Sequence, residues 1–184
     1  MKIVLATLWL LVPLGFAAFH FGPGQKHMAL DQTENFLSQG RRAASNEDWP
    51  GAIDAYQDAL AKLPKDELAM SRRLQLEIAK AKMQASALPE AREELAGLVE
   101  GLNNDPTAPA DLKEDALSAL ANSRYYMTYL MKLEGLPATE WEPEIEAARQ
   151  EYKLLAQIGS NKERHLADLE AAIRLARTEA SRFS

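Results

Sequence analysis

The stretch EDWPGAIDAYQDALAKLPKDE, from Glu47 to Glu67, decides the fold because its apolar residues recur at the spacing of an α-helix. These residues share one stripe and are Ala52, Ile53, Tyr56, Ala59, Leu60 and Leu63. Pro50 suits the first turn of a helix, and Pro64 ends it because proline cannot continue the backbone hydrogen-bond pattern. The stretch therefore predicts one amphipathic helix between these two prolines.

The residues before this helix predict a second helix packed against it. Apolar and small residues recur there at helical spacing, as Phe36, Leu37, Gly40, Ala43 and Ala44. The polar cluster at 45–48 lies between the two stripes and is typical of a turn. The sequence therefore predicts a hairpin of two helices, with small residues where the helices touch.

Seven residues of this hairpin stand in the register of a known repeat: Phe36, Gly40, Trp49, Ala52, Tyr56, Ala59 and Pro64. On these residues the hairpin resembles the tetratricopeptide repeat, a helix–turn–helix of roughly 34 residues. Glu47 departs from the pattern, because that position is usually glycine, so we expect a slightly different turn. The resemblance implies an all-α fold, a right-handed α-solenoid of stacked helix pairs. An unrelated αα-hairpin with an ordinary core stripe is the alternative.

Weaker matches to the same pattern continue along the chain. Matching positions are Ala79, Leu88, Ala91 and Leu95 in the second unit, and Ala148 and Tyr152 in the third. A long loop expected from Glu134 to Pro143 makes the third unit divergent. The helical domain, 31–184, is thus expected to hold repeat 1 at about 33–66, repeat 2 at about 67–104, the divergent unit at about 109–158 and a capping helix at about 161–183.

The last predicted helix carries a narrow apolar seam on an otherwise charged surface. The seam consists of Leu166, Leu169, Ile173, Ala176, Ala180 and Phe183. A repeat array needs a terminal helix with one apolar and one polar face, so a cap is the first interpretation. A short coiled coil that joins two copies of the chain is the second.

The first 21 residues predict a separate segment. A helix from Ile3 to Phe21 would be uncharged and would span roughly 28 Å, close to the thickness of a bilayer core. It is either a single-pass anchor or a signal peptide that is cleaved after Ala17. Lys2 before this segment favours an N-in orientation with the body in the periplasm or outside the cell. Residues 22–30 are expected to be a linker.

The composition excludes several classes of function. The chain has 21 basic and 27 acidic residues, and its net charge of −6 makes binding to nucleic acid unfavourable. It contains no cysteine, which excludes disulfides and thiolate metal sites. The three histidines do not form a metal-ligand pattern, and His165 is expected on the polar side of the last helix. No catalytic residue or cofactor is predicted, so we do not expect an enzyme.

The candidate residues for binding a partner gather in the third unit: Arg124, Tyr125, Tyr126, Tyr129 and Trp141. Tyrosine, tryptophan and arginine are enriched in protein interfaces. One face of a helix cannot bury all of the aromatic residues at 125–129, so some are expected to line the concave side of the array. Filling of the core around the divergent loop is the alternative.

The tetratricopeptide resemblance implies a protein that binds other proteins. We expect a membrane-tethered interaction scaffold or adaptor for assembly of an envelope complex, with a protein or peptide partner and a membrane contact through residues 3–21. The first alternative is a structural subunit that forms a homodimer through its C-terminal helix. The second is a secreted, soluble tetratricopeptide protein after signal cleavage.

Overall fold

The computed structural model describes residues 23–178, and within them it shows seven α-helices and no strand. The helices are α2 (Pro23–Ser45), α3 (Trp49–Lys62), α4 (Leu68–Gln84), α5 (Leu88–Asn103), α6 (Ala110–Leu133), α7 (Ala138–Ile158) and α8 (Lys162–Arg177). The predicted all-α fold is confirmed for this part of the chain. The predicted N-terminal helix at 1–21 lies outside the described residues.

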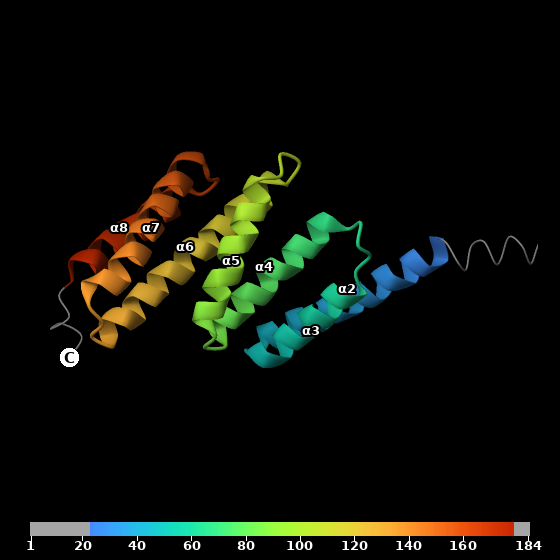
Figure 1. Cartoon of the computed structure of the whole chain (residues 1–184). Coiled ribbons are helices and arrows are strands. Elements are labelled where there is room, and N and C mark those ends of the chain that lie inside the picture. The colour runs from blue at the N-terminus through green and yellow to red at the C-terminus, as the bar shows by residue number, and fades with distance from the viewer. Residues whose placement is uncertain (1–22, 179–184) are drawn as a thin grey trace, which may run out of the picture.

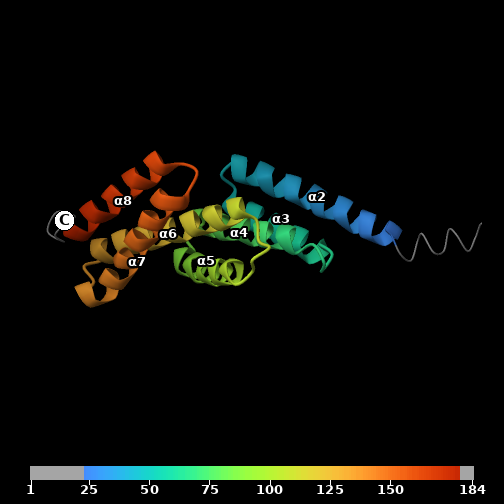
Figure 2. The same ribbon diagram turned by 90° about the horizontal axis from the view of Figure 1, so that it is seen from above.

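Each helix packs against the next one in the chain, so the seven helices form a consecutive array (Figure 1). Contacts also join α4 to α6, which are separated in the chain by α5. Seen from above, α2 and α8 lie on the opposite side of the array from α5 (Figure 2). This arrangement is compatible with a helical repeat fold.

The turns from α2 to α3, from α4 to α5 and from α6 to α7 share one backbone geometry. Each contains a residue with positive φ: Glu47 (59°), Ser86 (62°) and Gly135 (74°). In each turn the next amide donates to the carbonyl five residues earlier: Asp48 to Ala43 (2.9 Å), Ala87 to Lys82 (3.0 Å) and Leu136 to Met131 (2.9 Å). This hydrogen bond is the mark of a Schellman helix end. The same turn geometry therefore recurs three times, although the three positive-φ residues differ.

Small residues bring the first two helices close together. Ala52 and Ala59 of α3 are fully buried, and the Tyr56 side chain between them lies against Gly40 of α2. A Cβ on residue 40 would overlap the tyrosine ring, so only glycine allows this approach. The repeat-defining residues are buried at Gly40, Ala52, Tyr56, Ala59, Ala79, Ala91, Leu95, Ala148 and Tyr152, and half-buried at Phe36, Trp49 and Pro64.

The structure differs from the sequence prediction at the start of the helical domain. Residues 23–30 were expected to belong to a linker, but they form the first turns of α2. Lys26 forms ion pairs with Asp66 (2.6 Å) and Glu67 (2.9 Å) in the turn before α4. The predicted linker at 22–30 is therefore wrong for its described part.

The expected long loop in the third unit is also wrong. Helix α7 begins at Ala138 and contains Pro143, so the connection from α6 is only a short turn. A proline inside a helix removes one backbone hydrogen bond. Packing of Ile145 and Ala148 in the core of the third unit offsets this loss.

The apolar seam of the last helix does not coincide with its buried face. Helix α8 buries His165, Ala172 and Leu175, whereas Leu166 is 52% exposed. The prediction of an exposed His165 is wrong, because its ring packs beside Gly159 and its Nε2 lies 3.5 Å from Glu114 of α6. The seam positions Ala180 and Phe183 lie outside the described residues.

Candidate functional site

Three adjoining hollows along α4 and α6 form one groove. The charged hollow, of about 380 Å³, shares Tyr56, Glu77 and Asp115 with the middle hollow, of about 590 Å³. The middle hollow in turn shares Met83, Gln84 and Tyr126 with the apolar hollow, of about 610 Å³. Each hollow therefore borders the next, and together their lining follows α6 from Asp115 to its C-terminal end.

Helical spacing explains how α4 and α6 form this groove. Both helices run in the same direction because α5 reverses the chain between them. Residues three or four apart share one face of a helix. The groove residues follow this rule, with Arg73, Glu77, Lys80 and Gln84 on α4, and Asp115, Ala119, Asn122, Tyr126 and Leu130 on α6.

The apolar hollow exposes side chains that a monomeric core would bury. Nine large apolar residues are exposed in the described part of the chain, and three of them line this hollow from α6: Tyr126, Tyr129 and Leu130. Tyr126 is 53% exposed, and its ring meets the half-buried Tyr125 edge to face at 5.6 Å. A cluster of this kind is typical of a binding surface.

The middle hollow holds an oriented hydrogen-bond donor. The buried Tyr152 donates its hydroxyl hydrogen to the side-chain oxygen of Asn122 at 2.7 Å. Burial and the nearby Asp168 carboxylate raise the pKa of Tyr152, which keeps this hydroxyl protonated. Asn122 lines the hollow, and its amide hydrogens have no hydrogen-bond partner among the described residues, so they can donate to a bound group.

Charged residues line the same hollow from three helices. Lys80 of α4 is paired with Glu77 at 3.1 Å. Asp115 of α6 has no ion-pair partner among the residues that the structure describes. Arg164 of α8 completes this side of the hollow. The middle hollow therefore offers both donors and acceptors to a bound polar segment.

The predicted site residue Arg124 does not line any of the three hollows. Its guanidinium lies between Glu144 (3.0 Å) and Glu151 (3.1 Å) of α7, and Arg92 of α5 approaches Glu144 at 3.5 Å. Burial raises the pKa of Glu151 to about 7 despite the neighbouring arginine. The network links α5, α6 and α7.

Trp141 also lies away from the groove. The ammonium of Lys132 sits 3.6 Å from the centre of the Trp141 ring and donates to the carbonyl of Ala176 at 3.3 Å. Burial lowers the pKa of Lys132. The contact combines a cation–π interaction with a positive charge at the end of α8, where the helix dipole is negative. Trp141 therefore helps to join α6, α7 and α8.

The structure thus brings Tyr126 and Tyr129 together in the groove and places Tyr125, Arg124 and Trp141 beneath or beside it. Sequence reasoning missed the groove residues Met83, Leu88, Asn122 and Arg164. The helical phase of Tyr126 could have indicated Asn122, which lies four residues earlier on the same face. Nothing in the sequence shows that α4 and α8 border that face.

In comparisons with protein-family models, curated proteins and solved structures, nothing matches this chain. The tetratricopeptide resemblance therefore depends on the matching residues alone. Within residues 23–178, no helix combines the length and apolar character that a bilayer crossing needs.

Proposed function

We propose that this protein is an interaction scaffold whose groove along α4 and α6 holds a segment of a partner protein. The observation that supports this function best is the row of adjoining hollows, in which a polar middle hollow borders an apolar hollow at Tyr126. Repeat arrays bind partners on a preformed surface of this kind, where apolar anchors and oriented polar groups act together.

The type of helical repeat is part of the same proposal. A right-handed solenoid of tetratricopeptide-like pairs agrees with the seven matched residues and with the turn geometry that recurs at Glu47, Ser86 and Gly135. In such an array α8 serves as the capping helix, since it has one face on α7 and one face in solvent.

We further propose that residues 3–21 tether the scaffold to a membrane, with the helical body in the periplasm or outside the cell. The uncharged, apolar character of these residues supports the tether. Confinement at a membrane raises the effective concentration of the groove for other envelope proteins, which suits an adaptor in complex assembly. If the segment is cleaved, the same body is a secreted, soluble protein.

A structural subunit that dimerises through its C-terminal helix is the second candidate. The exposed Leu166 on α8 favours it, because an apolar residue at a seam position is left without a buried contact. The molecular mass of the full chain in detergent separates the two candidates. A monomer favours the adaptor, and a dimer that Leu166→Glu dissolves favours the structural subunit.

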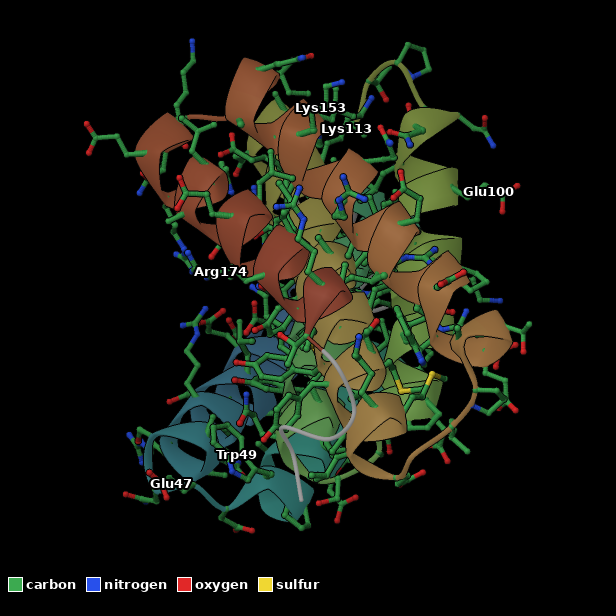
Figure 3. The ribbon with its side chains drawn as sticks, turned by 90° about the vertical axis from the view of Figure 1, so that its left-hand side faces the viewer. Glu47, Trp49, Glu100, Lys113, Lys153 and Arg174 are labelled. Carbon is green, nitrogen blue, oxygen red and sulfur yellow. The ribbon has the colours of Figure 1, made fainter. Side chains whose placement is uncertain are left out.

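Photocrosslinking in intact cells tests the scaffold directly. A crosslinking residue at position 126 faces the groove, whereas one at the exposed position 100 on α5 points away from the array (Figure 3). We expect the position-126 probe to capture one defined protein that the position-100 probe does not capture. Capture of the same proteins from both positions would contradict a partner-specific groove.

A substitution in the groove should weaken capture without loss of structure. Tyr126→Ala and Tyr129→Ala each remove an exposed aromatic side chain, so we expect unchanged helicity and a stability change within about 0.5 kcal/mol. Partner capture from a crosslinker at position 130 should fall by about tenfold or more, as for an aromatic hot spot. Loss of helicity in either variant would show that the tyrosine belongs to the core.

A further inference from the structure

The apolar hollow has a composition that suits aliphatic side chains of a partner. Its apolar lining comes from the end of α4, the start of α5, the second half of α6 and the turn after α6: Met83, Leu88, Pro89, Tyr126, Met127, Tyr129, Leu130, Met131 and Leu136. Three of these residues are methionines, whose flexible thioethers adapt to side chains of different shape. The hollow therefore favours an apolar stripe over a single fixed group.

The scarcity of polar groups in the hollow decides which backbone conformation fits it. Apart from the two tyrosine hydroxyls, the polar side chains of the described lining are Gln84, Ser86 and Glu134. An extended segment would bring unpaired amide and carbonyl groups into this apolar space, and each would lose hydrogen bonds to water. A helix pairs these groups internally and can present one apolar face. A helical partner segment is therefore favoured.

The length of the hollow fits about two turns of such a helix. The α6 wall runs from Tyr126 to Glu134, a rise of about 12 Å. Over this distance a bound helix presents side chains at positions i, i+3 or i+4, and i+7 on one face. Three apolar anchors can therefore enter the hollow together.

The charge at the rim specifies the polar part of the partner. Glu134 is the one charged residue in the described lining of the apolar hollow, and it lies at the end of α6. The whole chain carries a net charge of −6. A basic residue beside the apolar stripe would complement Glu134, whereas an acidic residue would be repelled.

We propose that the apolar hollow binds one face of an amphipathic helix from a partner protein, with a basic residue of that helix opposite Glu134. This inference depends on the proposed function, because it names the kind of segment that the groove holds. It adds the conformation of the segment, its apolar stripe and the sign of its charge.

Designed peptides and the full-length chain in a zwitterionic detergent test this assignment. The first peptide, of about 14 residues, has leucines at i, i+3, i+4 and i+7 with lysines on the flanks. The second has the same composition with the leucines scattered around the helix, and the third replaces the flanking lysines by glutamates. We expect the first to bind about tenfold or more tighter than either of the others, measured by fluorescence anisotropy.

Two matched pairs of variants locate the binding to the hollow. Leu130→Glu should weaken binding of the first peptide by about tenfold, while Ile158→Glu, at an exposed position on α7 outside the described lining of the hollow, should leave it within about twofold. Glu134→Lys should shift the preference from the lysine to the glutamate peptide, and Glu100→Lys, which changes the net charge equally, should not. Should Leu130→Glu lose helicity, Tyr126→Ala takes its place.

The outcomes separate this inference from the function on which it depends. Equal binding of the striped and scattered peptides, or equal effects of the two members of either variant pair, overturns the inference. If the position-126 crosslinker still captures one defined protein, the scaffold function is unaffected by that result. If the peptides discriminate as expected but no protein is captured in cells, the helix-binding surface stands and the scaffold function fails.

Discussion

The first helix pair and the third unit bury alanine and tyrosine at the same spacing, but different side chains surround these residues. Ala52 and Tyr56 of α3 correspond to Ala148 and Tyr152 of α7, and all four residues are buried. Around the first pair the packed neighbours are mainly apolar and the Tyr56 ring lies directly against Gly40, although Tyr56 also borders the charged hollow. The same spacing of small and aromatic residues therefore positions helices in two different environments.

The third unit adds buried and half-buried polar groups around the apolar cluster that holds its alanine and tyrosine. Arg124 and Glu151 form an ion pair, Lys132 caps the end of α8, and His165 lies beside Glu114. A buried ion pair gains little net free energy relative to an apolar pair, but removing one partner is costly. The first pair should therefore be sensitive to added charge, and the third unit should be sensitive to pH and to lost hydrogen bonds.

The largest effect is expected from a charge in the first pair. Ala52→Glu places a carboxylate at a fully buried helix contact, so we expect a loss of about 4 kcal/mol or more of unfolding free energy. Ala61→Glu puts the same side chain at an exposed position on the same helix and should change stability by less than about 0.5 kcal/mol. Urea unfolding followed by far-UV circular dichroism measures both, and equal stability of the two variants would refute the packing register.

The sequence predicted the all-α fold because apolar spacing reports directly on which helix faces are buried. It did not predict the short turn before α7, because Pro143 and Gly135 are typical of loops and only packing of Ile145 and Ala148 extends the helix past the proline. It also placed His165 in solvent, since a histidine among charged residues gives no sign of the carboxylate that α6 brings beside it.

The groove was predictable only in part for the same reason. Tyr126 and Tyr129 were predicted because one helix face cannot bury all the aromatic residues at 125–129, so some must be exposed or form a second surface. Arg124 and Trp141 are also residue types that are enriched in interfaces, yet Arg124 contacts Glu151 and Trp141 contacts Lys132 within the fold. Residue type indicates a capacity to bind, whereas helix phase and neighbouring elements decide whether the side chain faces solvent.

The third unit should respond to pH through Glu151. Burial raises the pKa of this carboxyl from an ordinary value of 4.5 to about 7, and the charged groups near it are Arg124, Glu144 and, behind Glu144, Arg92. Between these two pH values the folded chain keeps a proton that the unfolded chain releases. The contribution of Glu151 to stability therefore falls as pH rises through this window, by at most roughly 3 kcal/mol.

The variant Glu151→Gln isolates this contribution, because a glutamine keeps the acceptor for Arg124 and cannot ionise. We expect its stability relative to the unmodified chain to increase as pH rises from about 4.5 to about 7 and to stay constant above that range. Chemical denaturation at a series of pH values measures the difference. Parallel stability profiles for the two chains would mean that Glu151 titrates at an ordinary pH in the fold.

The smallest expected effect sharpens the comparison most, because it uses one substitution at equivalent positions. Tyr152→Phe removes the hydrogen bond to Asn122 and should cost about 1 kcal/mol. Tyr56→Phe removes a hydroxyl that has no hydrogen-bond partner among the described residues, so it should cost less than about 0.5 kcal/mol. Urea midpoints measure both, and an Asn122→Ala background should abolish the difference, since the partner of Tyr152 is then absent. If both substitutions lower the unfolding free energy equally in the unmodified background, the hydrogen bond of Tyr152 does not distinguish the third unit from the first pair.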